Sequence, residues 1–166
     1  VTERLYMEET FVDSIWNQII TSELRPTTDY RYSDLGFYLI ARLVEQQTGL
    51  TIDQYVNQHF YQPLGLRRTA YNPWSRFDRK AIVPTEEDRY FRRQRVQGYV
   101  HDMGAAMLGG VSGHAGLFST AEELAVILQM LLQGGYYGNR QYLKSETIEL
   151  FTQRHPKETR RAIGFD

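Results

Sequence analysis

The length, composition and charge of this chain indicate a folded protein segment and exclude several classes. With 166 residues, of which 42% are hydrophobic, the chain can bury one core of ordinary size, so a single domain over residues 1–166 is predicted. A net charge of −1 gives no support for a nucleic-acid partner or an anionic membrane. The absence of cysteine excludes disulfides and thiolate chemistry but leaves the compartment open.

The first predicted element is a helix over residues 8–21. Its apolar side chains recur at roughly helical spacing and are those of Phe11, Ile15, Ile19 and Ile20. Pro26 ends this first segment. No run in the sequence approaches the 18 or more apolar residues of a membrane-spanning helix, so no membrane span is predicted.

A Tyr-x-Asp triplet, Tyr32-Ser33-Asp34, stands directly ahead of the second predicted helix. Ser33 or Asp34 can cap its first turn, and Gly49 supplies the left-handed residue that ends it. The apolar residues expected to face the core are Leu35, Leu39, Ile40, Leu43 and Val44. Tyr32 is therefore expected on a loop braced by a buried helix, which is a suitable place for a catalytic tyrosine.

A short capped helix and a long loop are predicted next. Thr51 and Gln54 form a capping box whose helix closes at Pro63 and Gly65. Residues 66–100 lack sustained periodicity, which favours a long loop with room for a short strand over a separate domain. A solvated basic surface is favoured there over contact with an acidic substrate or a neighbouring domain. Its basic residues are Arg67, Arg68, Arg89, Arg92, Arg93 and Arg95.

The C-terminal part is predicted to contain two helices separated by a short hairpin. A second capping box, Ser119-Thr120-Ala121-Glu122, opens a helix that Gly134-Gly135 ends. A short hairpin is expected around residues 137–140 and a last helix over residues 145–154. The whole pattern predicts a mainly α fold with a short hairpin.

A glycine-rich segment carries the second signature of the chain. From Gly109 to Leu124 it reads Gly-Gly-Val-Ser-Gly-His-Ala-Gly-Leu-Phe-Ser-Thr-Ala-Glu-Glu-Leu. With the Tyr-x-Asp triplet, in this order and spacing, it resembles the serine β-lactamase and penicillin-binding-protein superfamily. The resemblance covers about residues 24–135. Within the superfamily, the chain looks most like the branch of class C-like esterases and D-alanyl-D-alanine carboxypeptidases. It implies the helical subdomain of the β-lactamase/transpeptidase-like fold, excised from an α/β parent.

The chemistry of this superfamily needs three elements, of which the chain carries one. A Ser-x-x-Lys supplies the nucleophile, a Tyr-x-Asn or Ser-Asp-Asn element transfers a proton, and a Lys-Thr-Gly or His-Thr-Gly strand binds the substrate carboxylate. None of the seven serines is followed three residues later by lysine, and no Lys-Thr-Gly or His-Thr-Gly is present. The chain is therefore interpreted as the central fragment of a longer hydrolase, inactive alone.

The resemblance also implies partners and a setting for the parent protein. The substrate would be a small-molecule ester or D-amino-acid peptide, cleaved through an acyl-enzyme without a cofactor. The missing flanking segments of the parent chain would be the structural partners of this one. Members of the branch occur fused to a family 3 glycoside hydrolase, a β-N-acetylhexosaminidase, which implies a cell-wall-related role in the bacterial periplasm or envelope.

By resemblance, Tyr32 is the general base and acid, with a buried and satisfied aromatic as the alternative. The pKa of a tyrosine phenol is ordinarily about 10, and nearby cations lower that pKa. Asp34 stands where the family commonly has asparagine; its carboxylate can pair with the missing lysine or cap the helix, but when ionised cannot donate. Ser33 and the stretch Gly113-His114-Ala115 would line the substrate cleft. A tight turn feeding the next helix is the alternative for that stretch.

Two further function classes stay open from the sequence. One is a non-catalytic binding module that kept the fold and lost the chemistry. The other is a metal-dependent hydrolase using His101, Asp102 and His114. Because their spacing matches no helical His-x-x-x-His pair, surface or core histidines are favoured over metal ligands.

Overall fold

The computed structural model describes residues 1–27, 31–154 and 161–165. The chain divides into two compact units, each built from two separate stretches of sequence. Unit 1 comprises Val1–Tyr55 and Ala70–Phe118, and unit 2 comprises Val56–Thr69 and Ser119–Asp166. The Tyr-x-Asp triplet lies in unit 1, and so does the glycine-rich segment as far as Phe118. The capping box that begins at Ser119 belongs to unit 2.

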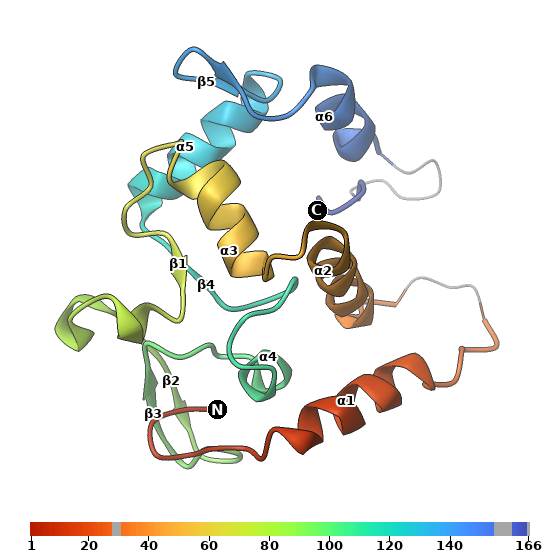
Figure 1. Ribbon diagram of the computed structural model, residues 1–166, viewed down its shortest axis with the longest axis vertical. Helices are drawn as coiled ribbons and strands as arrows, with labels where there is room; N and C mark the ends of the chain where they lie inside the picture. Colours follow the sequence, from red (N-terminus) through yellow and green to blue (C-terminus); the bar gives the residue numbers. More distant parts are fainter. Residues whose placement is uncertain (28–30, 155–160, 166) are drawn as a thin grey trace. The chain divides into compact units, whose positions relative to one another are not determined.

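Unit 1 combines helices with two small antiparallel sheets (Figure 1). Its helices are α1 (Thr10–Ile20), α2 (Leu35–Thr48), most of α3 (Ile52–Val56) and α4 (Met103–Met107), with 3₁₀ turns at Pro73–Ser75 and Arg79–Ala81. Its strands are β1 (Ala70–Tyr71), β2 (Pro84–Asp88), β3 (Gln94–Gln97) and β4 (Leu117–Phe118). β1 pairs with β4, with Ala70 opposite Phe118, and β2 pairs with β3 as a hairpin.

Helix α2 buries a different face from the predicted one. Leu39 and Leu43, expected in the core, are 47% and 54% exposed, and Ala41 is the residue of α2 that is buried. The packed side of α2 carries Tyr38 and Ala41, and the Phe37 carbonyl oxygen lies against Gly113 while the Phe37 side chain is exposed. The prediction of a buried helix behind Tyr32 is wrong in this respect, because the small Ala41 permits close packing where the leucines do not.

The region predicted as a long loop holds more regular structure than expected. It contains the β2–β3 hairpin, and at its centre lies Arg92, whose side chain is fully buried. Arg92 donates to Asp88 Oδ2 at 2.8 Å, to the carbonyl oxygens of Val100 and His101 at 2.6 Å, and to Glu86. The expectation of a solvated basic surface is therefore wrong for Arg92, although Arg89 remains exposed as expected.

Unit 2 is built around an apolar core in which Met130 of α5 (Ala121–Leu132) packs with Tyr61, Leu64 and Leu66. Its other elements are a π-helical turn at Asn57–Tyr61, the strands β5 (Tyr136–Tyr137) and β6 (Arg140–Gln141), and α6 (Ser145–Thr152). The predicted hairpin and the predicted last helix are confirmed.

Helix α5 begins one residue later than its predicted capping box. Thr120, rather than Ser119, caps it by accepting from the Glu123 N–H. The Glu123 carboxylate accepts from the backbone N–H of Arg67 and Arg68 and from the Thr69 hydroxyl. Burial alone would raise the pKa of Glu123, but these hydrogen bonds outweigh it and hold that pKa below its usual value.

The remaining predicted helices are confirmed as α1, α2 and α3, with Gly49 in the left-handed conformation directly after α2. At the start of α3, Thr51 N–H donates to Gln54 Oε1, which is one half of the predicted capping box. In the part of the chain that the structure describes, none of the helices has the length and apolar character needed to cross a bilayer.

Candidate functional site

The Tyr-x-Asp triplet forms the entry to α2. Ser33 Oγ accepts from the Leu35 N–H at 3.3 Å, so Ser33 supplies the cap that the sequence left open between two residues. Asp34 occupies the cap position without a side-chain capping bond. Tyr32 is 71% exposed, which excludes the alternative of a buried, satisfied aromatic for this residue. The triplet thus presents a phenol to solvent and leaves the Asp34 carboxylate available for another partner.

A second group of polar side chains surrounds His114, whose own side chain is 5% exposed. Its Nε2 lies 2.9 Å from Asp102 Oδ1, and its Nδ1 lies 2.9 Å from Ser112 Oγ. Asp102 Oδ1 also accepts from the Ala105 N–H at 2.6 Å and so caps α4. Both ring nitrogens of a buried imidazole are therefore paired, and the ring orientation is fixed.

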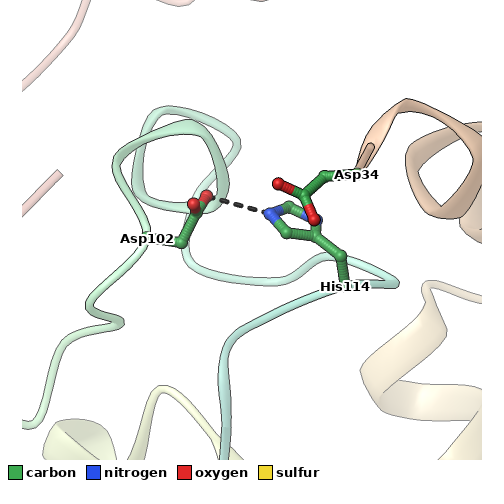
Figure 2. A group of neighbouring side chains, drawn as sticks. All are labelled: Asp34, Asp102 and His114. Atoms are coloured by element: carbon green, nitrogen blue, oxygen red, sulfur yellow. Dashed lines mark hydrogen bonds and ion pairs between the residues drawn. The ribbon is translucent and has the colours of Figure 1, made fainter. Parts of the chain in front are cut away.

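Asp34 faces this pair from the start of α2 (Figure 2). One carboxylate oxygen of Asp34, one of Asp102 and a ring nitrogen of His114 all lie within 4.8 Å of one another. We call Asp34, Asp102 and His114 the His114 cluster. The fold thus joins two residues that the sequence predicted for the site, Asp34 and His114, with one that it named only in the metal-hydrolase alternative.

His101, the third residue of that alternative, lies elsewhere. Its Nδ1 is 3.1 Å from Glu86 Oε2, and its side chain is exposed. The donor set named from the sequence is therefore wrong in one member, because the backbone turns between His101 and Asp102 and sends their side chains to different neighbours.

Tyr38, one turn after Asp34, completes the wall around His114. The two rings are 4.3 Å apart between centroids, tilted by 51°. Burial, and then the charges of Asp102 and Asp34, raise the pKa of Tyr38 to about 12, so this phenol stays protonated at neutral pH. Tyr38 was not singled out in the sequence, although its position four residues after Asp34 on one helix face was a usable signal.

The charge state of Asp102 is set by competing causes. Burial alone would raise its pKa, but hydrogen bonds from the Ala105 N–H and from His114 outweigh burial and hold the pKa of Asp102 below its usual value. Asp102 is thus an anion at neutral pH, beside a second carboxylate from Asp34.

The glycine-rich stretch is held against α2 by close backbone contact. A Cβ on Gly113 would lie 2.3 Å from the Phe37 carbonyl oxygen, so this position requires glycine for packing. Ala115 packs against a small core formed by Val100, Ala105 and Ala106. Of the three residues of this stretch, His114 is therefore the one whose side chain joins the polar cluster, and its neighbours pack the loop against the rest of unit 1.

Ser112, His114 and Asp102 form a Ser-His-Asp chain of hydrogen bonds, but not an accessible nucleophile. Ser112 is 4% exposed, and its hydroxyl is already bonded to His114 Nδ1. An acyl acceptor must be open to its substrate on one side. The array therefore orients the imidazole instead of attacking a carbonyl.

A pocket of about 290 Å³ adjoins this site and shares Tyr38 and Ser112 with it. Its polar lining includes Arg42, whose guanidinium lies 4.4 Å from the centre of the Trp16 ring. Glu45 and Asp53 also line this pocket, so its charged side chains give no preference for an anionic group.

Comparison with known proteins places these observations in a family. The family model described as "Beta-lactamase" matches residues 2–166. A protein of Escherichia coli K12 named "Putative D-alanyl-D-alanine carboxypeptidase" is 36% identical over 155 residues, which cover 86% of this chain and 36% of that protein. The chain thus spans about a third of the length of this curated relative.

Solved structures agree at the level of the fold. The penicillin-binding protein of Bacillus halodurans superimposes with a TM-score of 0.60 at 16% identity, over 90% of this chain and 44% of that one. The D-amino acid amidase of Ochrobactrum anthropi gives a TM-score of 0.53 at 14% identity, over 78% of this chain and 36% of that one. With the matching family model and the curated relative, these likenesses show that the chain belongs to the β-lactamase family of penicillin-binding-protein-like hydrolases.

Proposed function

We propose that this chain is the part of a β-lactamase-family serine hydrolase that carries its Tyr-x-Asp proton-transfer element. The observation that supports this most is the exposed Tyr32 phenol at the entry to α2, two residues before a carboxylate that faces the buried His114. The full-length protein would act on an ester or a D-amino-acid peptide. Its nucleophile would come from outside these 166 residues, because none of their serines belongs to a Ser-x-x-Lys.

The proposed reaction follows the acyl-enzyme route. Tyr32, as the general base, takes the proton of the nucleophilic serine while the serine oxygen attacks the substrate carbonyl. The tetrahedral intermediate collapses when Tyr32 returns that proton to the leaving alcohol or amine. Water then attacks the acyl-serine ester by the same proton path, releasing the acid and restoring the serine.

Asp34 sets a limit on the substrate. The family resemblance implies an asparagine at this position, whose amide both donates and accepts, whereas an ionised carboxylate only accepts. Asp34 would therefore pair with the lysine of the parent's Ser-x-x-Lys and would not bind the substrate carbonyl. This favours an esterase or peptidase over a β-lactamase.

The decisive variant of the full-length protein is Tyr32→Phe. We expect kcat for ester or D-alanyl-D-alanine substrates to fall by roughly 100- to 10,000-fold, the usual contribution of a positioned proton-transfer group. The melting temperature should stay unchanged, because Tyr32 is exposed. Tyr90→Phe, at another highly exposed tyrosine, is the matched control and should leave kcat unchanged. Retained activity in Tyr32→Phe would contradict the proposal.

The same proposal requires the 166-residue chain alone to form no acyl-enzyme. Incubation with a labelled penicillin and with a fluorophosphonate, followed by intact-mass measurement, should show no stoichiometric adduct. An adduct on Ser112 or on any other serine of the chain would mean that the nucleophile lies within it. Absence of an adduct in the full-length protein as well would instead favour a non-catalytic binding module.

A further inference from the structure

The three donor atoms of the His114 cluster occupy the volume of one coordination sphere. His114 Nε2 and Asp102 Oδ1 are 2.9 Å apart, and one oxygen of Asp34 completes a set lying within 4.8 Å. Ligands that bind a divalent ion at about 2.0 to 2.2 Å lie roughly 3 to 4 Å from one another. The set therefore needs only small side-chain rotations to meet at one ion.

The groups behind these donors are those that a metal ligand needs. In the metal-free chain His114 Nε2 donates to the Asp102 carboxylate, so an ion could bind there only when that proton moves to Nδ1. Ser112 Oγ, 2.9 Å from Nδ1, can accept the relocated proton and hold the imidazole in the tautomer that a metal needs. The Ala105 N–H holds the Asp102 carboxylate in place. In the described part of the chain the Asp34 side chain makes no hydrogen bond, so binding an ion there would cost it no existing partner.

The charge of the cluster also favours a cation. It brings two carboxylates beside one imidazole, and among the described residues neither Asp34 nor Asp102 forms an ion pair with a lysine or an arginine. Two carboxylates this close repel each other unless a positive charge lies between them.

We propose that Asp34, Asp102 and His114 form a binding site for one divalent cation that accepts mixed nitrogen and oxygen ligands, such as Zn²⁺ or Mn²⁺. One nitrogen and two carboxylate oxygens suit these ions, whereas Mg²⁺ prefers an all-oxygen shell. The bound ion would tie together the start of α2, the cap of α4 and the loop before β4. This site goes beyond acyl transfer, and it takes one oxygen of Asp34, so that the other oxygen remains for the lysine that the proposed function assigns to it.

The direct test is a zinc titration of the 166-residue chain after treatment with a chelator. Calorimetry should show one Zn²⁺ bound per chain. Asp34→Asn should weaken this binding at least about tenfold, because it removes a ligand charge. The matched control is Asp13→Asn, which removes an exposed carboxylate on α1 and should leave the affinity unchanged.

A second measurement does not depend on any variant. NMR of chain with ¹⁵N-labelled histidine follows the four imidazoles separately, and Zn²⁺ should shift the ring nitrogens of His114 at one equivalent. Three outcomes would overturn the site: no saturable binding, full affinity in Asp34→Asn, or a shift confined to another histidine. The last would indicate adventitious binding at the surface.

Discussion

Two polar clusters of unit 1 use similar residues for different purposes. In the first, which we call the Arg92 cluster, the buried Arg92 guanidinium meets Asp88 and Glu86, and its remaining N–H groups donate to backbone carbonyls. In the His114 cluster the buried group is an imidazole facing Asp102, with the Asp34 carboxylate close by and unbonded. A satisfied cluster of buried charges fixes structure, whereas one with an unused carboxylate retains capacity for a ligand.

The comparison is tested most strongly by Arg92→Ala. Removal of a buried cation that bonds two carboxylates and two carbonyls should cost about 3 to 5 kcal/mol of unfolding free energy. Arg89→Ala, at an exposed position of the same hairpin, should change it by less than about 0.5 kcal/mol. Urea denaturation of both variants measures the difference. Equal stabilities would mean that the Arg92 cluster contributes no more than a surface arginine.

The contact between the His114 loop and α2 is tested by Gly113→Ala. Its new Cβ would meet the Phe37 carbonyl oxygen at 2.3 Å, which forces a backbone shift and should cost about 1 to 3 kcal/mol. Gly36→Ala is a control of opposite sign on the same helix. No atom lies within 4 Å of a Cβ there, so alanine should stabilise α2 by about 0.5 to 1 kcal/mol. Thermal melts should separate the two variants.

The sequence predicted what local patterns determine. Gly49 after α2, and a capped helix near Thr120, follow from residue preferences within a few positions. The cap was misplaced by one residue because Ser119-x-x-Glu122 and Thr120-x-x-Glu123 both match the capping-box pattern. In the structure the Glu123 carboxylate bonds the backbone of Arg67 and Arg68. That interaction lies more than fifty residues away in sequence, where local preference carries no information.

The candidate site could be predicted only in part, because its residues are recognised locally but brought together by long-range packing. Motif resemblance found Asp34 and His114 separately, but their meeting depends on how the glycine-rich loop packs on α2. The burial of Arg92 escaped prediction because a run of arginines normally indicates a solvated surface. Only the hairpin geometry, which brings Asp88 and the Val100 carbonyl to one side chain, reveals the exception.

Acid should weaken the Arg92 cluster. The hydrogen bond from Arg92, reinforced by the backbone N–H groups of residues 90–92, holds the pKa of Asp88 well below its usual value. Because the folded pKa is lower than the unfolded one of about 3.9, the stabilisation is complete above that value and is lost as pH falls towards the folded pKa. Urea midpoints between pH 5 and pH 2 should therefore decline less steeply in Asp88→Asn than in the unaltered chain. Asp13→Asn should retain the original slope.

The smallest expected effect is the most specific to the His114 cluster. Without added metal, Asp34→Asn should leave the unfolding free energy within about 0.5 kcal/mol of the unaltered chain, with any change towards greater stability. The reason is that the Asp34 carboxylate makes no capping bond and faces the anionic Asp102 across His114, so its removal lowers repulsion without breaking a bond. Asp88→Asn makes the same chemical change at a carboxylate that is bonded to Arg92, and it should destabilise the chain clearly. If Asp34→Asn proves as destabilising as Asp88→Asn, then Asp34 is a structural residue like Asp88, and the distinction between the two clusters is wrong.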